Sequence, residues 1–187
     1  MESGTIYFEN TGAENTKATL QVVRRRAEEL GIKKVVIASN TGTSAVKALD
    51  ILGGVKLITV THVTGFREPN VQEFNEENRK VIESRNGAVL TAAHAFAGIS
   101  IAMRNKYQMP GLGLIIADTL RIFGQGTKVA CEVAMMAADA GLVRTDEDII
   151  SIGGTNGGSD TALVVTPANT HRFFDLKVRE ILCKPRL

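Results

Sequence analysis

At residues 35–49 the chain reads VVIASNTGTSAVKAL, which predicts a strand, a short polar turn and a helix. The apolar run 35–38 suits a strand that is covered on both faces, as in a parallel sheet. After residue 44 the apolar residues return at helical spacing, and Gly53-Gly54 can end the helix. A buried strand that leads directly into a helix is the basic unit of an α/β protein.

The turn between this strand and this helix is rich in hydrogen-bonding groups. Its six residues are Ser39, Asn40, Thr41, Gly42, Thr43 and Ser44, which supply four hydroxyls, one amide and one glycine. A helix start carries free backbone N–H groups and the positive end of the helix dipole. Gly42 would let the backbone approach a ligand closely. We therefore expect the turn to bind an anion, most naturally a phosphate.

A simpler interpretation of the turn is that Thr43 or Ser44 caps the helix. A cap needs one such residue, and the turn offers more. The spacing Ser-x-Thr-Gly-x-Ser is also similar to the phosphate loop of flavodoxins, which implies FMN as a candidate ligand. The turn lacks the lysine of a Walker A loop, so the pattern does not indicate ATP hydrolysis.

The rest of the chain alternates strand and helix patterns. We expect strands at 6–8, 57–61, 88–91, 149–152 and 161–165, helices at 16–30, 72–85, 96–103 and 129–140, and a small terminal element at 178–182. Residues 114–123 fit a helix better than a strand at 114–117. The loop after residue 152 is too short for a helical crossover, so the last strand pair should be antiparallel. The predicted fold is a single α/β domain over residues 1–187, a three-layer α/β/α sandwich with a mostly parallel sheet and an antiparallel C-terminal strand.

Composition sets the limits on function. The chain has 187 residues, of which 44% are hydrophobic and 22% charged, and its net charge is +2. This balance is ordinary for a soluble globular protein and gives no indication of a nucleic-acid partner. No apolar run approaches the ~18 residues of a membrane span. Cys131 and Cys183 do not have a metal-ligand spacing, and their scarcity fits a cytoplasmic protein. We expect no metal and no membrane contact.

Polar residues follow the third and fourth expected strands. His62, Thr64 and Gly65 follow one strand, while Thr91 ends the next strand and His94 lies just beyond it. Open α/β sheets bind ligands at the carboxyl ends of their strands, so these residues are candidates for the ligand site. Each histidine could act as a general acid or base, and a structural role is equally open.

Two charged residues lie in the less regular middle of the chain. Asp118 interrupts an apolar run, and it either faces the cleft as a catalytic candidate or pairs with Arg121 at the i, i+3 spacing. Lys128 belongs to the sequence Gly-x-Gly-Thr-Lys, which we interpret first as a helix start and second as an anion contact.

A glycine-rich loop follows the strand at 149–152. Residues 153–160 contain four glycines, and the candidate ligand residues are Gly154, Thr155, Asn156, Gly157 and Asp160. A hairpin needs only two special residues, so the longer run suggests a lid that approaches the ligand held at 39–44. The alternative is a loose hairpin tip.

Three segments together resemble the C-terminal domain of pyruvate kinase. Two of them, KVVIASNTGTSA at 34–45 and GGTNGGSDT at 153–161, resemble that domain itself, and NTGAENT at 10–16 is similar to the N-terminal turn of stand-alone proteins of this kind. In that domain the first segment grips a phosphate of a sugar bisphosphate effector and the second precedes the antiparallel last strand. The chain is similar to a small prokaryotic group of stand-alone proteins of this kind. The resemblance implies a three-layer fold with a mixed sheet, and it does not extend to the kinase reaction.

Three functions are consistent with the sequence. The first is binding of a phosphorylated small molecule, either FMN or another nucleotide, or a sugar phosphate. The second is an enzyme that acts on such a ligand through His62, His94, Asp118 and Lys128. The third is a regulatory module that docks partners through Arg24, Arg25 and Arg26 and the polar helix at 72–85, although these arginines could equally form a solvated face. A homo-oligomer is compatible with all three.

Overall fold

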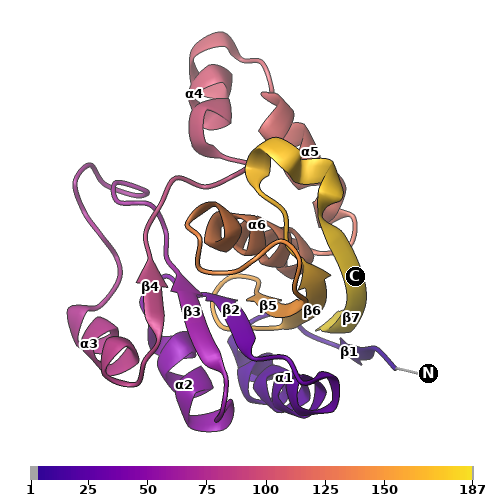
Figure 1. Ribbon diagram of the computed structural model, residues 1–187. Helices are drawn as coiled ribbons and strands as arrows, with labels where there is room; N and C mark the ends of the chain where they lie inside the picture. The colour runs from indigo at the N-terminus through magenta and orange to yellow at the C-terminus, as the bar shows by residue number, and fades with distance from the viewer. Residues whose placement is uncertain (1–3, 187) are drawn as a thin grey trace.

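The computed structural model describes residues 4–186, and its strands form one seven-stranded sheet in the order β1-β7-β6-β5-β2-β3-β4 (Figure 1). The strands are β1 (Ile6–Phe8), β2 (Lys34–Ala38), β3 (Lys56–Val60), β4 (Ala88–Leu90), β5 (Ile149–Gly153), β6 (Thr161–Thr166) and β7 (Lys177–Pro185). Among these strands β6 runs against the other six, since it pairs antiparallel with both β5 and β7 while the remaining pairs are parallel. The predicted mostly parallel sheet with an antiparallel strand near the C-terminus is confirmed.

Strand β2 lies in the middle of the sheet, between β5 and β3. Val35 and Ile37 belong to the apolar cluster on one face, and Val36 belongs to the cluster on the other. All three side chains are fully buried. Burial on both faces explains why this strand has an unbroken apolar sequence.

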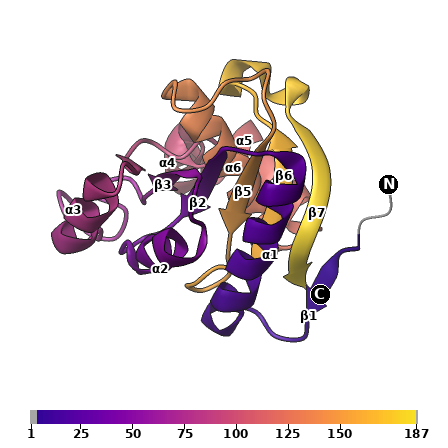
Figure 2. The same ribbon diagram turned by 60° about the horizontal axis from the view of Figure 1, so that its bottom comes forward.

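Helices cover both faces of the sheet, which confirms the three-layer arrangement. One face packs against α1 (Thr16–Leu30), α2 (Thr43–Ile51) and α3 (Glu76–Ser84), and the other packs against α6 (Gln125–Asp139). Figure 2 shows α1 and α2 on the near side of the sheet and α6 on the far side. Short 3-10 turns, η1 (Ala13–Asn15) and η2 (Thr170–Asp175), precede α1 and β7. The predicted end of the first helix is confirmed, because Gly31 takes the left-handed conformation with φ 67°.

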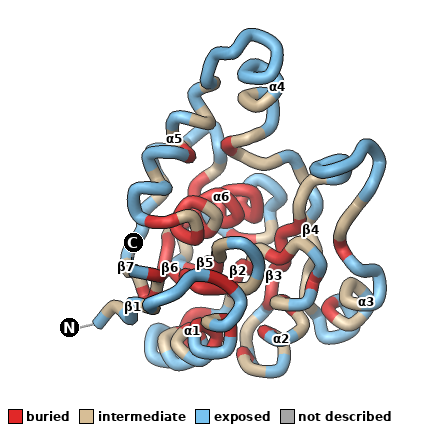
Figure 3. The backbone as a smooth tube through the Cα atoms, turned by 180° about the vertical axis from the view of Figure 1, so that it is seen from behind, coloured by how far each residue is buried: buried red, intermediate tan, exposed pale blue. Residues whose placement is uncertain are grey.

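The segment between β4 and α6 forms two helices, α4 (Gly98–Tyr107) and α5 (Leu112–Arg121). The preference for a helix at 114–123 over a strand is therefore confirmed. Helix α4 packs against α5 and projects away from the sheet (Figure 1), and Figure 3 shows that it is largely exposed. Large apolar side chains are exposed on both helices, among them Ile99 and Leu112.

Several predicted boundaries are wrong for local reasons. The helix expected at 72–85 begins at Glu76, because the Asn75 side chain accepts hydrogen bonds from the N–H groups of Glu77 and Asn78 and caps it there. The helix expected at 129–140 begins at Gln125, so Gly124 of the Gly-x-Gly-Thr-Lys sequence is its N-cap and the other four residues form its first turn.

Two strands have places in the sheet that the sequence did not predict. The terminal element expected at 178–182 is the nine-residue strand β7, which pairs with β6. Strand β1 lies beside β7 at the edge of the sheet, far from β2. Within residues 4–186 no helix has both the length and the apolar character needed to cross a bilayer.

Candidate functional site

The polar turn at 39–44 connects β2 to α2 and is held from behind by α3. The N–H of Ser39 donates to the carbonyl of Val60, which continues the pairing of β2 with β3. Ser39 Oγ accepts the N–H of Gly42 at 3.1 Å. The carbonyl of Thr41 accepts from the N–H of Asn75 and from Nδ2 of Asn78. These bonds fix the shape of the turn without any ligand.

Gly42 has a packing role that the sequence did not predict. Its φ is 91°, and a Cβ atom there would lie 2.7 Å from Cβ of Asn78 and 2.8 Å from Cζ of Phe74. Glycine is therefore required because α3 and the residues before it pack against the turn. This packing accounts for the glycine without a ligand, and the expectation that Gly42 brings the backbone close to a ligand stays a prediction.

On its outer side the turn has backbone N–H groups that are unpaired among the described residues. Within residues 4–186 no protein group accepts a hydrogen bond from the backbone N–H of Asn40, Thr41, Thr43 or Ser44. The hydroxyls of Thr41 and Thr43 lie 3.1 Å apart and bond to each other. Lys47, one helical turn further on, has no ion partner among the same residues. Free N–H groups, hydroxyls and a lysine at a helix start form an environment suited to an anion.

The turn borders a cleft of about 1060 Å³. The cleft is also lined by the ends of β3 and β4, the loop after β5, and helices α4, α5 and α6. The sequence-predicted residues that line it are Ser39, Asn40, Thr41, Thr43, Ser44, His62, His94, Asp118, Lys128, Gly154, Asn156 and Gly157. Residues more than 100 positions apart in the sequence are thus brought to one site at the carboxyl ends of the strands.

Some sequence-predicted residues lie outside the lining of this cleft: Gly42, Thr64, Gly65, Thr91, Thr155 and Asp160. Thr64 accepts a hydrogen bond from Gln72, and Thr91 Oγ1 lies 2.7 Å from Thr61 Oγ1. Gly65 donates its N–H to the carbonyl of Val71 and has φ 83°. The polar groups of Thr64, Gly65 and Thr91 therefore shape the loop at 61–75 rather than reaching the cleft.

The carboxylate of Asp160 is fully buried and binds the protein itself. Oδ2 accepts the N–H of Gly12 at 2.8 Å and the N–H of Thr155 at 3.1 Å, and Oδ1 accepts the Thr161 hydroxyl at 2.8 Å. A Cβ atom on Gly158 would lie 2.3 Å from Cα of Ala13. Gly158 therefore allows close packing of this loop against η1 and the first residue of α1, and the loop is not a loose hairpin tip.

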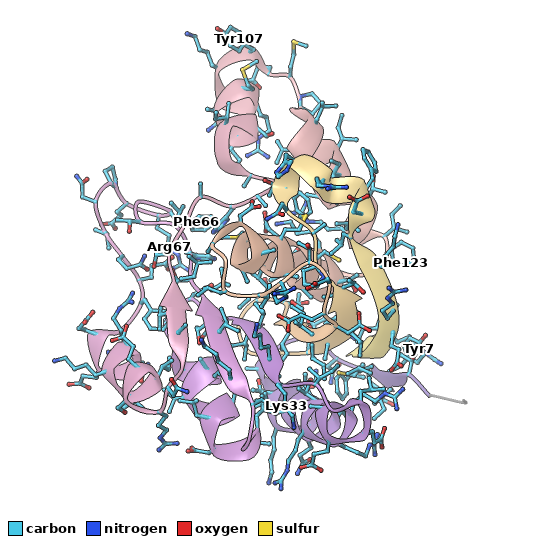
Figure 4. The ribbon with its side chains drawn as sticks, in the orientation of Figure 1. Tyr7, Lys33, Phe66, Arg67, Tyr107 and Phe123 are labelled. Carbon is cyan, nitrogen blue, oxygen red and sulfur yellow. The ribbon has the colours of Figure 1, made fainter. Side chains whose placement is uncertain are left out.

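The two cleft histidines form an aromatic cluster with Phe66. The ring centroids of His62 and Phe66 are 4.0 Å apart, and those of His62 and His94 are 5.5 Å apart. His62 Nδ1 lies 2.7 Å from Oε2 of Glu73, whose other oxygen binds Nε of Arg67 at 2.8 Å. Figure 4 shows Phe66 and Arg67 on the loop that follows β3. We call His62, Phe66 and His94 the histidine wall.

His94 is partly buried and bonds to the loop that carries His62. Its Nε2 accepts the N–H of Val63 at 3.4 Å. Desolvation lowers the pKa of His94 below its usual value, and this effect exceeds the opposing attraction of Glu132. The positive charge of Lys128 adds to the lowering of this pKa, as does that of His62 when its ring is protonated. The neutral form of His94 is therefore favoured.

Two charged pairs complete the lining of the cleft. Lys128 and Glu132 form a buried ion pair on α6, and Glu132 also accepts the N–H of Phe96 at 2.9 Å. Lys128 is inside a helix and already paired, so its sequence is a helix start, as first interpreted. Asp118 forms the predicted i, i+3 ion pair with Arg121, and 74% of its side chain is exposed.

Sequence reasoning missed several residues of the cleft. Glu73, Phe66 and Arg67 lie in an irregular loop, where no periodicity indicates which side chains meet. Lys47 could have been found, because it stands four residues after Thr43 and so lies on the same helix face.

The fold and the site define an α/β domain with a cleft at the carboxyl ends of its parallel strands. A family model described as pyruvate kinase, alpha/beta domain, matches residues 17–165. The chain therefore belongs to the family of the pyruvate kinase alpha/beta domain. The match includes the 39–44 turn, the histidine wall and the glycine-rich loop.

Proposed function

We propose that the protein binds a phosphorylated small molecule, with the phosphate at the 39–44 turn. The observation that carries this proposal is the set of unused backbone N–H groups at Asn40, Thr41, Thr43 and Ser44 beside an open cleft. Such groups at a helix start bind phosphate oxygens without further rearrangement. Because the turn is already fixed by Ser39, Asn75 and Asn78, binding would require little ordering of the backbone.

The distribution of charge favours the same end of the cleft. Arg67, Arg121 and Lys128 each have an acidic partner. Among the lining residues within 4–186, Lys47 and Arg104 have no such partner. Lys47 lies on α2 next to the turn, so its charge adds to the positive end of the helix dipole.

Two ligand classes are consistent with this site. FMN is the first, because of the Ser-x-Thr-Gly-x-Ser spacing, and a sugar phosphate is the second, because of the family resemblance. A cleft of about 1060 Å³ is large enough for either. In both cases the loop at 153–160 would form a fixed wall beside the phosphate, since Asp160 ties it to Gly12.

A triple variant tests the proposal. Thr41→Val, Thr43→Val and Ser44→Ala together remove three hydroxyls from the turn and leave the backbone in place. We expect the affinity for FMN, or for glucose 6-phosphate, to fall at least about 10-fold, since each lost hydrogen bond to a charged group is worth roughly 1.5 kcal/mol or more. Isothermal titration calorimetry with both compounds measures the effect, and riboflavin shows how much the phosphate contributes to FMN binding.

The control is Thr145→Val, which changes an exposed threonine outside the cleft. It should leave both affinities unchanged. If the triple variant binds as tightly as the unchanged protein, the turn does not hold the phosphate and the proposal fails.

The docking alternative has less support. Arg24 pairs with Glu28, Arg25 with Glu29, and Arg26 with Glu29 and Glu180. These arginines are therefore already engaged on the surface of their own domain. A homo-oligomer stays a prediction.

A further inference from the structure

His62 is arranged so that one ring nitrogen remains available in the cleft. The Glu73 carboxylate can only accept a hydrogen bond, so at 2.7 Å from Nδ1 it places the imidazole proton on that atom. In the neutral ring Nε2 then carries a lone pair. Within residues 4–186 no protein group bonds to Nε2. This nitrogen is not buried away from solvent. His62 therefore offers a proton acceptor to the cleft.

His94 offers the complementary group. Its Nε2 accepts a backbone N–H from Val63, so the proton of the neutral ring lies on Nδ1. The Nδ1 atom of His94 has no hydrogen-bond partner within the described residues and is likewise not buried away from solvent. Burial favours the neutral ring by lowering the pKa of His94. His94 can then donate a hydrogen bond from Nδ1–H to an oxygen while its ring is neutral.

The topology places these two groups next to the phosphate turn. The turn follows β2, His62 follows β3, and the loop that carries His94 follows β4, and these three strands are adjacent and parallel. All three groups line the same cleft. A ligand fixed by its phosphate at the turn could therefore present its reacting atoms to both histidines.

We propose that the histidine wall is an acid–base catalytic site for a phosphorylated hydroxy-carbonyl compound. This inference rests on the proposed phosphate binding, and of the two ligand classes it favours the sugar phosphate. His62 Nε2 takes the proton from the carbon beside the carbonyl, and the C–H electron pair forms the carbon–carbon double bond of an enediolate. The carbonyl electron pair moves to its oxygen, to which His94 Nδ1–H donates a hydrogen bond. Return of the proton to the original carbon restores the compound. Return to the former carbonyl carbon gives the isomer, and it requires that the remaining hydroxyl proton passes to the other oxygen. Neither outcome needs an oxidant, a reductant or a second substrate.

The two cysteines and Lys128 are poorer candidates than His62 for the base that takes the proton. Burial raises the pKa of the Cys131 thiol to about 12 and that of Cys183 to about 11, so both thiols are protonated near neutral pH. The Lys128 ammonium is held by Glu132. Glu73 acts as a positioning residue, since it reaches the cleft chemistry through His62.

Proton exchange with solvent is the direct test. Dihydroxyacetone phosphate serves as the probe, and ¹H NMR in D₂O follows the loss of its carbon-bound protons. We expect the wild-type protein to catalyse this exchange. His62→Gln should slow it at least about 100-fold, and His94→Leu about 100-fold, because a general base and an oxyanion donor each contribute on this scale. Calorimetry should show that both variants still bind the probe.

Two further measurements make the result decisive. His171→Gln changes an exposed histidine outside the cleft and should exchange protons at the wild-type rate. The imidazole ¹⁵N spectrum of the wild-type protein at pH 8 should show the proton of His62 and of His94 on Nδ1. In Glu73→Gln, His62 should show a mixture of the two proton positions together with slower exchange.

The outcomes separate this inference from the phosphate proposal. If the probe binds but no exchange exceeds the protein-free rate, or if exchange persists in His62→Gln, the acid–base role fails and phosphate binding stands. Binding of FMN without binding of the probe leads to the same conclusion. If neither the probe, FMN nor inorganic phosphate binds, both proposals fall. A His62 proton on Nε2 also overturns the acid–base role.

Discussion

Two of the loops that border the cleft use their polar groups in opposite ways. In the loop after β5 the Asp160 carboxylate accepts two backbone N–H groups and one hydroxyl, and the N–H of Ser159 donates to Thr16. In the turn after β2 the N–H groups of Thr43 and Ser44 have no protein partner within residues 4–186. We call the first the braced loop and the second the open turn.

The difference indicates which loop contributes stability and which contributes binding. Hydrogen bonds made inside the protein stabilise the fold, and leaving a buried donor unpaired is costly. Donors left open at a helix start add little to folding but remain available to an anion. Substitutions in the braced loop should therefore lower the free energy of unfolding, while substitutions in the open turn should lower ligand affinity.

Asp160→Ala should give the largest effect on stability. It leaves the N–H groups of Gly12 and Thr155 and the Thr161 hydroxyl without their acceptor at a buried position. We expect the free energy of unfolding to fall by about 4 kcal/mol, measured by urea denaturation. Thr43→Val in the open turn is the counterpart and should change it by less than about 0.5 kcal/mol. Equal losses in the two variants would remove the distinction between the loops.

Two neighbouring glycines of the braced loop give a matched pair. Gly158 has φ 72°, and a Cβ atom there would lie 2.3 Å from Cα of Ala13. Gly157 has φ 98° but no atom within 4 Å of its Cβ position. Gly158→Ala should destabilise by about 3 kcal/mol through both strain and a clash, and Gly157→Ala by about 1 kcal/mol through strain alone.

The same urea experiment tests this pair. A Gly158→Ala variant no less stable than Gly157→Ala would show that the loop can move away from α1, and the loop would then not be braced.

The sequence predicted the elements that depend on local patterns. The strand and helix around the open turn, the first helix with its Gly31 end, and the antiparallel pair β5 and β6 all follow from apolar spacing, glycine positions and loop length. A few neighbouring residues are enough to predict each of these features.

The features that sequence reasoning missed depend on distant contacts. Asp160 looked like a ligand residue, yet its carboxylate binds Gly12, 148 positions away. Gly42 looked like a site of close ligand approach, yet it makes room for Phe74 and Asn78. The pairing of His62 with Glu73 requires an irregular loop to fold back, and no periodic pattern records such a loop.

The smallest predicted change in the free energy of unfolding comes from the titration of His94 in the histidine wall. Desolvation lowers the pKa of His94 in the folded state, so the unfolded chain, with an ordinary histidine pKa of about 6.5, binds more protons just below that pH. The stabilisation is thus complete above about pH 6.5 and is lost as the pH falls below it. Because His94 is partly exposed and Glu132 attracts its proton, we expect a loss of less than about 1 kcal/mol per pH unit.

Urea denaturation at intervals between pH 7.5 and pH 5 measures this slope, and the variants His94→Leu and His171→Gln separate its sources. The carboxylates of Asp146 and Glu147, whose pKa values are lowered in the folded state, contribute to the slope only toward the acidic end of this window, and equally in all the variants. The slope should shrink in His94→Leu and persist in His171→Gln. A slope unchanged in His94→Leu would mean that His94 is not held neutral by the fold, and it could then not serve as the neutral donor opposite His62.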